Sequence, residues 1–539
     1  MGKKRISSND NIQLFSKNIG FRLAHIFAMR RLKKIMKKSD KSFQKTGKKI
    51  LFNMIYGMHG RYIYWELALA KSLQLRGHDV KVLSCGKTFD MCTSEFNVQS
   101  VHNKKTCDLC VKYSHEFLDH IKIPYQIYNK YISNEEIKEI KNKVLNLSKK
   151  ECQSYKYRDI NAGLLSENAV LRYFEGDIKP DEKEEEKVLK TELINTIIAI
   201  NAAEKILKTE KPEVLVTRHL GYSSWGGFAQ YFNKNKIRVV EPGDGYKENY
   251  IGFDFDNEDI PDKNFNKYYQ NFRKKKPLSK TEEKELEFFL KNRVEGKDGD
   301  TALYGYGIKD VKSRFSPEKY KKTYSAFPNV AWDSSLLNAH KGFGDVYEWI
   351  SFIVELFKKN PDYQLLIKIH PSEAFVAKSK NTVSDYILKN HSPLTDNIKI
   401  IPPVTDISPY SLFSFIDTGL VYNGTIGLEM ALHKIPVIVA GIAHYGKKGF
   451  TYDIKSKNEL EKIIFNKISK LSEKRLELAK IYGYYYFVKS YIPYDVVFKD
   501  SFLKIGWNIK STDEFKPGMN KYLDKICDYI ANGGIYQDW

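Results

Sequence analysis

The fold is decided by residues 415–441, which read FIDTGLVYNGTIGLEMALHKIPVIVAG. The apolar run ending at Tyr422 predicts a buried strand, residues 423–425 predict a turn and helix start, and residues 435–439 predict a second strand rich in β-branched side chains. Together they form one βαβ unit. The turn would direct backbone N–H groups and the positive end of a helix dipole at a ligand above the strand, which suits a phosphate. The alternative is an ordinary parallel-sheet repeat without a ligand.

Glu429 adds a polar group to this unit. It follows Thr425 by one helical turn, so both side chains would lie on the same helix face. A carboxylate at that position could accept hydrogen bonds from sugar hydroxyls.

Length and composition exclude several classes of protein. A chain of 539 residues is too long for one core and fits two domains with additional segments. The net charge of +22 comes from lysines spread along the whole chain, which indicates attraction to anionic surfaces rather than a nucleic-acid reader. The sequence shows no zinc-finger, RNA-recognition or helix-turn-helix signature, and we expect no nucleic-acid partner.

The sequence also predicts the compartment. It has no run of about 18 uncharged apolar residues, the length that spans a membrane. Charged residues interrupt the first apolar stretch, so it does not fit a cleavable signal peptide. We expect a cytoplasmic protein, and the six cysteines fit a reducing compartment.

Residues 1–47 are basic, and residues 21–38 have helical periodicity. Such a helix could lie on the anionic inner face of the cell membrane, which would make the protein peripheral. It could instead pack its apolar stripe on the protein itself. The apolar side would carry Phe21, Ala24, Ala28, Leu32, Ile35 and Met36, and the basic side would carry Arg22, Arg30, Lys33, Lys34, Lys37 and Lys38.

A second βαβ unit is predicted from residue 48 to residue 84. The strand at 49–56 is followed by a loop with Gly57, His59 and Gly60, and a helix and another strand come next. Two glycines at the end of a first strand would let a ligand approach closely, so this loop is a candidate wall of an active-site cleft. It could also be only a tight turn.

Four cysteines follow within 26 positions: Cys85, Cys92, Cys107 and Cys110. The last two form a Cys-x-x-Cys pair, and four thiols could hold a structural zinc ion. The spacing of the first pair is not that of a standard finger, and reduced, buried thiols are the alternative.

Two polar loops follow the next predicted strands. The strand at 212–217 leads into Arg218 and His219, and the strand at 237–240 leads into Glu241 and Asp244 within EPGDGY. Acidic groups just past a strand end, in a loop bent by Gly and Pro, are placed for chemistry at the carboxyl edge of a sheet. The alternative is that Asp244 only forms a turn.

A second α/β series begins near residue 323. Its strand at 363–369 ends at His370, and Pro371 then fixes an extended backbone. A histidine at this edge is placed to act on a ligand. Further on, the loop at 443–453 carries Lys447 and Lys448, again past a strand end.

These patterns predict five segments. They are a basic N-terminal segment at 1–47, a Rossmann-like domain at 48–255, a charged crossing at 256–322, a second Rossmann-like domain at 323–470, and C-terminal helices at 471–539 that pack back across both domains.

Two Rossmann-like domains facing a cleft describe the GT-B glycosyltransferase architecture, and the chain resembles the capsule polysaccharide biosynthesis family of bacterial surface-glycan transferases, which includes the capsule Kdo transferases. The resemblance covers about residues 210–455. It rests on EPGDGY at 241–246, FPNVAWD at 327–333, IHPSE at 369–373, VYNGTIGLE at 421–429 and GFTYD at 449–453.

The resemblance implies a role for each motif. It makes Asp244 or Glu241 the catalytic carboxylate and His370 a phosphate ligand or acid. The donor would be held by residues of the His-Pro pair, the turn and the lysine loop: Pro371, Asn423, Gly424, Thr425, Gly427, Glu429, Lys447 and Lys448. Gly57, His59, Gly60, Arg218 and His219 would line the acceptor side. The family's acidic motif often has adjacent carboxylates and its turn usually carries Ser-Thr, whereas this chain has Gly243 and Gly424 at those places.

The expected reaction moves a sugar from a nucleotide sugar, which could be CMP-activated, to a glycan or lipid-linked acceptor. Transfer needs a carboxylate and a positive group for the departing phosphate. The helix start, His370 and the two lysines could supply the positive group, so we expect no metal and no cofactor. Two alternatives stand beside this interpretation: a nucleotide-sugar 2-epimerase, and a non-catalytic scaffold of a membrane glycan-assembly complex.

Overall fold

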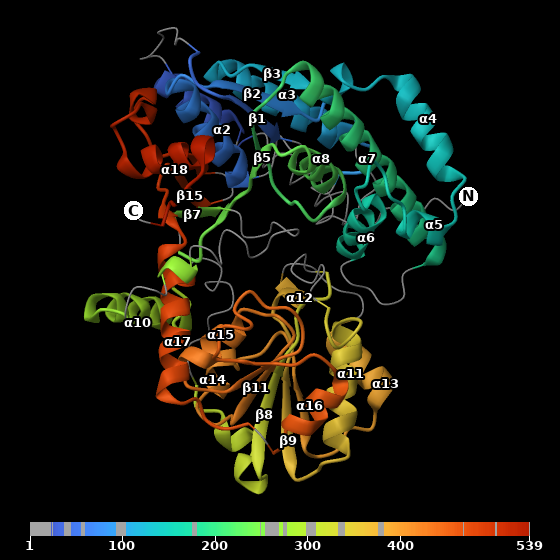
Figure 1. Ribbon diagram of the computed structural model, residues 1–539, viewed down its shortest axis with the longest axis vertical. Helices are drawn as coiled ribbons and strands as arrows, with labels where there is room; N and C mark the ends of the chain where they lie inside the picture. The colour runs from blue at the N-terminus through green and yellow to red at the C-terminus, as the bar shows by residue number, and fades with distance from the viewer. Residues whose placement is uncertain are drawn as a thin grey trace.

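The computed structural model describes residues 23, 25–36, 45–54, 60–92, 104–174, 181–247, 249–253, 269–272, 277–297, 309–332, 340–375, 382–466, 468–501 and 504–537. Two parallel sheets with helices on both faces dominate it (Figure 1). This confirms the expected fold class of two Rossmann-like domains.

The N-terminal sheet has the strand order β3-β2-β1-β4-β5, and every pair in it is parallel. Alternate residues of a strand point to opposite faces, so Phe52 packs with α2 and α3 while Leu51 packs with α6, α7 and α8. The strands are β1 (Lys49–Met54), β2 (Asp79–Ser84), β3 (Tyr125–Ile127), β4 (Val214–Val216) and β5 (Arg238–Val240). The helices are α2 (Gly60–Leu75), α3 (Lys104–Ile121), α6 (Ala162–Tyr173), α7 (Glu182–Thr209) and α8 (Ser223–Lys234).

Two further helices, α4 (Asn134–Leu145) and α5 (Lys149–Gln153), precede α6. Helix α4 begins with a capping box, because Ser133 and Glu136 satisfy each other's backbone N–H groups.

The C-terminal sheet has the order β10-β9-β8-β11-β12-β13 and is also parallel throughout. Counted in chain order this is 3-2-1-4-5-6, the strand order of dinucleotide-binding folds. Its strands are β8 (Lys322–Phe327), β9 (Tyr363–Lys368), β10 (Ile398–Ile401), β11 (Thr418–Val421), β12 (Val437–Val439) and β13 (Tyr452–Asp453). Its helices are α11 (Val346–Lys358), α12 (Ser372–Phe375), α13 (Val383–His391), α14 (Pro409–Leu412), α15 (Ile426–Leu432) and α16 (Lys457–Ile463).

Two helices lie next to each other where the chain connects the two sheets (Figure 1). They are α10 (Lys280–Val294) and α17 (Glu473–Tyr484). Lys480 pairs with Glu283 at 2.9 Å, and the Tyr484 hydroxyl donates to Glu285 at 2.7 Å. Helix α17 continues as a π-helical turn, η7 (Tyr485–Lys489).

The sequence predicted helices for residues 471–539, but the structure also has strands in this part of the chain. Strand β14 (Ile492–Pro493) pairs with β7 (Tyr250–Phe253), and β7 pairs with β6 (Pro242–Asp244), so a small antiparallel sheet joins residues from both halves of the chain. A hairpin of β15 (Val497–Ser501) and β16 (Lys504–Trp507) follows.

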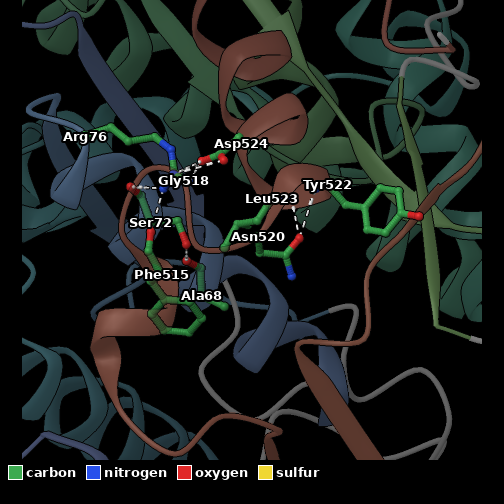
Figure 2. Close-up of polar contacts among 9 residues, drawn as sticks. All are labelled: Ala68, Ser72, Arg76, Phe515, Gly518, Asn520, Tyr522, Leu523 and Asp524. Atoms are coloured by element: carbon green, nitrogen blue, oxygen red, sulfur yellow. Dashed lines mark hydrogen bonds and ion pairs between the residues drawn. The ribbon is translucent and has the colours of Figure 1, made fainter. Parts of the chain in front are cut away.

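Helix α18 (Lys521–Asn532) then packs into the core of the N-terminal sheet. Figure 2 shows how its start is fixed to α2: the Arg76 guanidinium donates to the Ser72 carbonyl at 2.8 Å and to the Phe515 carbonyl at 2.6 Å, and it pairs with Asp524. Asn520 caps the helix by accepting from two backbone N–H groups. The last segment therefore belongs structurally to the first domain.

The N-terminal helix, described at 25–36, is attached to the same core. Ala28, Met29, Leu32 and Ile35 are buried in it. The described part of the predicted apolar stripe therefore packs on the protein, which is the second of the two alternatives that the sequence left open. Phe21 and Ala24 of the stripe lie outside the described residues. Of the parts of the chain that the structure describes, no helix is both long enough and apolar enough to cross a membrane.

Candidate active site

Two loops from different domains meet at Tyr246. This residue ends the EPGDGY motif, and its hydroxyl lies 3.3 Å from Thr425 Oγ1, in the turn after β11. It also lies 3.0 Å from the Tyr486 hydroxyl of η7. The structure thus brings together the acidic motif and the phosphate-suited turn.

A second contact joins the two domains. The Arg172 guanidinium, at the end of α6, lies 4.2 Å from the ring of Trp332 in the loop after β8. Such a separation is typical of a cation–π interaction.

The acidic motif is held by the small antiparallel sheet. Asp244 lies opposite Ile251 in β7, and the Gly245 N–H donates to the Tyr250 carbonyl at 3.0 Å. A Cβ at Gly245 would come 2.8 Å from the Tyr250 Cβ, so this place requires glycine. The backbone of Asp244 is described, whereas its side chain lies outside what the structure describes.

Glu241 has a different setting from Asp244. Its side chain is buried, and one carboxylate oxygen accepts the His219 N–H at 2.5 Å. His219 has a positive φ of 54°, a conformation that few side chains adopt, and its ring lies 4.6 Å from the Trp225 ring. Glu241 therefore holds the loop after β4 in a strained conformation.

Arg218, in the same loop, is buried and ion-paired with Glu66 of α2. Its guanidinium lies 4.1 Å from the Tyr62 ring centre. Burial is the main influence on Glu66 and raises the pKa of its carboxyl, while Arg218 opposes this rise. Of the other acceptor-side residues, Gly60 is the first residue of α2, and Gly57 and His59 lie outside the described residues.

The turn after β11 lies at the switch point of the C-terminal sheet. The strand order reverses between β8 and β11, the place where open α/β sheets bind ligands. Here the Asn423 N–H donates to Asn329 Oδ1 of the loop after β8, at 3.4 Å. Thr425 precedes α15 and its side chain makes no capping hydrogen bond.

Tyr445, in the loop after β12, supports this turn by a hydrogen bond. Its hydroxyl donates to the Gly424 carbonyl at 2.7 Å. A Cβ at Gly427 would lie 2.1 Å from the same hydroxyl oxygen, so the first turn of α15 needs a glycine there.

The surroundings of Glu429 differ from those expected of a ligand of sugar hydroxyls. It is 2% exposed, and one of its oxygens accepts from Arg293 Nε at 3.2 Å and Nη2 at 3.1 Å. Its other oxygen accepts the Tyr410 hydroxyl. A carboxylate so buried and so occupied is not open to a ligand in this structure, because protein donors already surround it.

Arg293 was missed by the sequence, which assigned its region to a charged crossing. It is 6% exposed, comes from α10, and lies 5.0 Å from the Tyr246 ring centre as well as on Glu429. It therefore connects the acidic motif with the helix after the donor turn. Arg293 is the single arginine of α10, and this is the signal in the sequence that could have identified it.

His370 lies at the end of β9, as expected, and its Nδ1 accepts the Ser372 N–H at 3.1 Å. The neutral ring therefore carries its proton on Nε2, the form that can donate to an anionic oxygen. Pro371 is buried. Glu373 follows in the same motif, and burial raises the pKa of its carboxyl to about 7.

The two lysines of the 443–453 loop have unlike surroundings. Lys447 is exposed, and its N–H donates to Asp453 at 3.0 Å. Lys448 is 8% exposed, with its ammonium 5.9 Å from the ring centres of Tyr269 and Tyr482. In the same loop, His444 stacks on Tyr486 at 4.0 Å, and burial lowers the pKa of its ring to about 3, so the ring is neutral.

The structure does not gather the four cysteines into a group that could hold a zinc ion. Within the described part of the chain, no three His, Cys, Asp or Glu side chains lie close enough together to hold a metal ion. Cys85 is packed at the end of β2, where burial is the largest influence and raises the pKa of its thiol. This favours the protonated form rather than the thiolate that binds metal.

Comparison with known proteins gives one family. Residues 268–495 match the model described as capsule polysaccharide biosynthesis protein. No curated protein matches the sequence.

Several solved structures are distantly similar. One is the β-Kdo 2,4 transferase KpsC of Thermosulfurimonas dismutans, at 15% identity over 57% of this chain and 88% of that chain, with a TM-score of 0.35. Another is the S. aureus MnaA–UDP co-structure, at 12% identity over 81% and 92%, with a TM-score of 0.26. A third is the UDP-GlcNAc 2-epimerase of Neisseria meningitidis, at 13% identity over 81% and 95%, with a TM-score of 0.23.

Proposed function

Residues 268–495 belong to the capsule polysaccharide biosynthesis family, and on that premise we propose that the protein is a GT-B-type glycosyltransferase of capsule or surface-polysaccharide synthesis. It moves a sugar from a nucleotide sugar to a glycan or lipid-linked acceptor. The observation that carries the proposal is the contact of Tyr246 with Thr425, which joins the acidic motif to the turn at the switch point.

In this proposal Asp244 is the carboxylate that activates the acceptor hydroxyl or attacks the anomeric carbon. Glu241 is less suited, because it is buried and accepts the His219 N–H. We therefore assign Glu241 to positioning the loop that bears Arg218 and His219 on the acceptor side.

The donor phosphate would lie over the turn at 423–425. His370 would donate to it from Nε2, and Lys447 would add positive charge as the phosphate departs. Asn423, Gly424 and Thr425 supply the turn itself, with Gly427 allowing its support by Tyr445. Lys448 and Glu429 would act through neighbouring groups, because both are buried.

A transfer assay with labelled donor tests the two assigned groups. We expect Asp244→Asn and His370→Ala to lower turnover by roughly 10² or more while the protein stays folded, since each removes a group that acts in the reaction. Leu145→Ser, on the exposed side of α4, is the matched control and should keep normal turnover. Near-normal rates in both site variants would remove this site from the proposal.

The same assay tests the expectation that transfer needs no metal. Activity should persist in excess EDTA, because the positive groups assigned to the phosphate belong to the protein. Loss of activity in chelator, with rescue by Mg²⁺, would contradict this expectation.

A thermal-shift screen of nucleotides narrows the donor, since a bound donor raises the apparent melting temperature by mass action. A response to CMP and not to UDP would indicate a CMP-activated sugar. Release of a free epimerised sugar without acceptor would instead indicate a 2-epimerase. Binding without either reaction would indicate a scaffold.

A further inference from the structure

The helix at 25–36 has two faces with different surroundings. Its inner face is buried in the N-terminal core through Ala28, Leu32 and Ile35. Polar contacts fix it as well: His25 Nε2 lies 2.6 Å from Glu116, and Arg31 Nε donates to the Trp507 carbonyl at 2.9 Å. The opposite face is therefore held outward.

Three large apolar side chains lie on that outward face. Leu23, Ile26 and Phe27 are 42%, 45% and 55% exposed. Their spacing of three and four residues places them on one side of the helix. The other large apolar side chains exposed to this degree, among the residues that the structure describes, are spread over separate segments, so this group stands apart.

Basic side chains continue the same face through the next turns. Arg30, Lys33 and Lys34 are exposed and follow Phe27 at helical spacing. Residues 21–38 contain no Asp or Glu. Nothing acidic on this helix would oppose an anionic surface.

We propose that this outward face, defined by Leu23, Ile26, Phe27, Arg30, Lys33 and Lys34, binds the surface of a membrane that contains anionic lipid. The apolar side chains would enter the interface between headgroups and acyl chains, and the basic ones would pair with headgroup phosphates. A mixed apolar and cationic face fits a lipid interface better than an acidic protein, which would leave the three apolar side chains unmatched.

The face is small, so binding is reversible and depends on charge. The inference uses the side of the helix opposite to the stripe that the sequence suggested. It does not depend on the transfer reaction, although a membrane-bound enzyme would meet lipid-linked acceptors there.

Co-sedimentation of the full chain with vesicles tests the proposal. Vesicles of phosphatidylcholine with phosphatidylglycerol should bind the protein, and those of phosphatidylcholine alone should bind it at least fivefold less. Raising the salt should release it. Absence of binding to the anionic vesicles would overturn the proposal.

Two variants separate the apolar and the basic contributions to vesicle binding. Leu23→Ser/Ile26→Ser/Phe27→Ser removes the apolar part, and Lys33→Glu/Lys34→Glu reverses part of the charge; each should lower the bound fraction at least fivefold without changing the melting temperature. Phe288→Ser removes an apolar side chain that is 67% exposed on α10 and should bind as the unaltered protein does.

Equal binding by all four proteins would show that another surface is responsible. If the triple substitution instead converts a dimer to a monomer without lipid, and vesicle binding is unaffected, the face joins two copies of the chain and the proposal is wrong.

Discussion

Arg293 adds a second connection between the two motifs, beside the contact of Tyr246 with Thr425. Its guanidinium donates twice to the buried carboxylate of Glu429 and lies against the ring of Tyr246. A buried ion pair adds little net stability, but removing one partner leaves the other charged and without compensation. Arg293 therefore links the order of the acidic motif to the helix after the donor turn.

We expect Arg293→Met and Glu429→Gln each to lower the free energy of unfolding, Arg293→Met by about 3–5 kcal/mol because it leaves a buried carboxylate unpaired. The double variant should lose much less than the sum of the two. Urea unfolding of all four proteins gives the coupling energy. Additive losses would show that the pair does not act as a unit.

At the scale of elements, the turn after β11 and strand β6 are each held in place by neighbouring elements. The turn is supported by Tyr445 from the loop after β12, and β6 by β7 and β14. Neither support is local in sequence. Each motif is therefore placed by an element that joins it only in the folded chain.

Gly427→Ala tests the support of the turn. The added methyl would collide with the Tyr445 hydroxyl, so Tyr445 must move and its hydrogen bond to Gly424 is lost. We expect nucleotide affinity to fall about tenfold, as measured by titration calorimetry, in line with one lost hydrogen bond of about 1–1.5 kcal/mol. Gly427→Ala/Tyr445→Phe should recover part of the loss because the colliding oxygen is gone; a double variant as weak as Gly427→Ala would place the defect elsewhere.

The elements also show which features could be predicted from the sequence. The βαβ units at 48–84 and 415–441 could be, because strand, turn and helix signals there are contiguous. The sheet of β6, β7 and β14 could not, since Ile492 pairs with Ile251 far away in the chain. The N-terminal helix could be predicted as well. The sequence did not determine which of its sides packs on the protein, because both sides carry apolar residues.

The site follows the same division. The positions of His370 and Thr425 at strand ends could be predicted, since parallel strands bring their carboxyl ends to one edge. The partners of Glu429 could not, because Arg293 and Tyr410 reach it from other elements. A carboxylate on a predicted helix face does not show whether it meets ligand or protein.

At the scale of the whole molecule, the last helix completes the first domain. Helix α18 buries Leu523, Ile526 and Ile530 in the N-terminal core. Its final carbonyls accept from Lys48 at 3.0 Å and from Arg238 at 3.0 and 3.3 Å. The first domain is therefore complete only when the end of the chain has returned to it.

Ending the chain at Met519, which removes α18, should therefore destabilise the N-terminal sheet. We expect faster amide exchange in β1 and β4 and unchanged exchange in β8 and β11, because local stability follows the lost apolar contacts. Hydrogen–deuterium exchange read by mass spectrometry measures both. Asp524→Asn, which alters the contacts with Arg76 and with the Gly518 N–H, should give a smaller change of the same kind. Equal loss of protection in both sheets would contradict this division.

The pairing of β7 with β14 also restricts how the domains can move. One of these strands leads out of the N-terminal half and the other leads back into it, so two covalent connections lie side by side and are hydrogen-bonded together. Bodies tied at two neighbouring points can rotate about the line through them, but they resist sliding and twisting past each other. Opening and closing is thus the easy motion, and because β6 belongs to the same small sheet, Asp244 lies close to the axis and shifts least as the domains part.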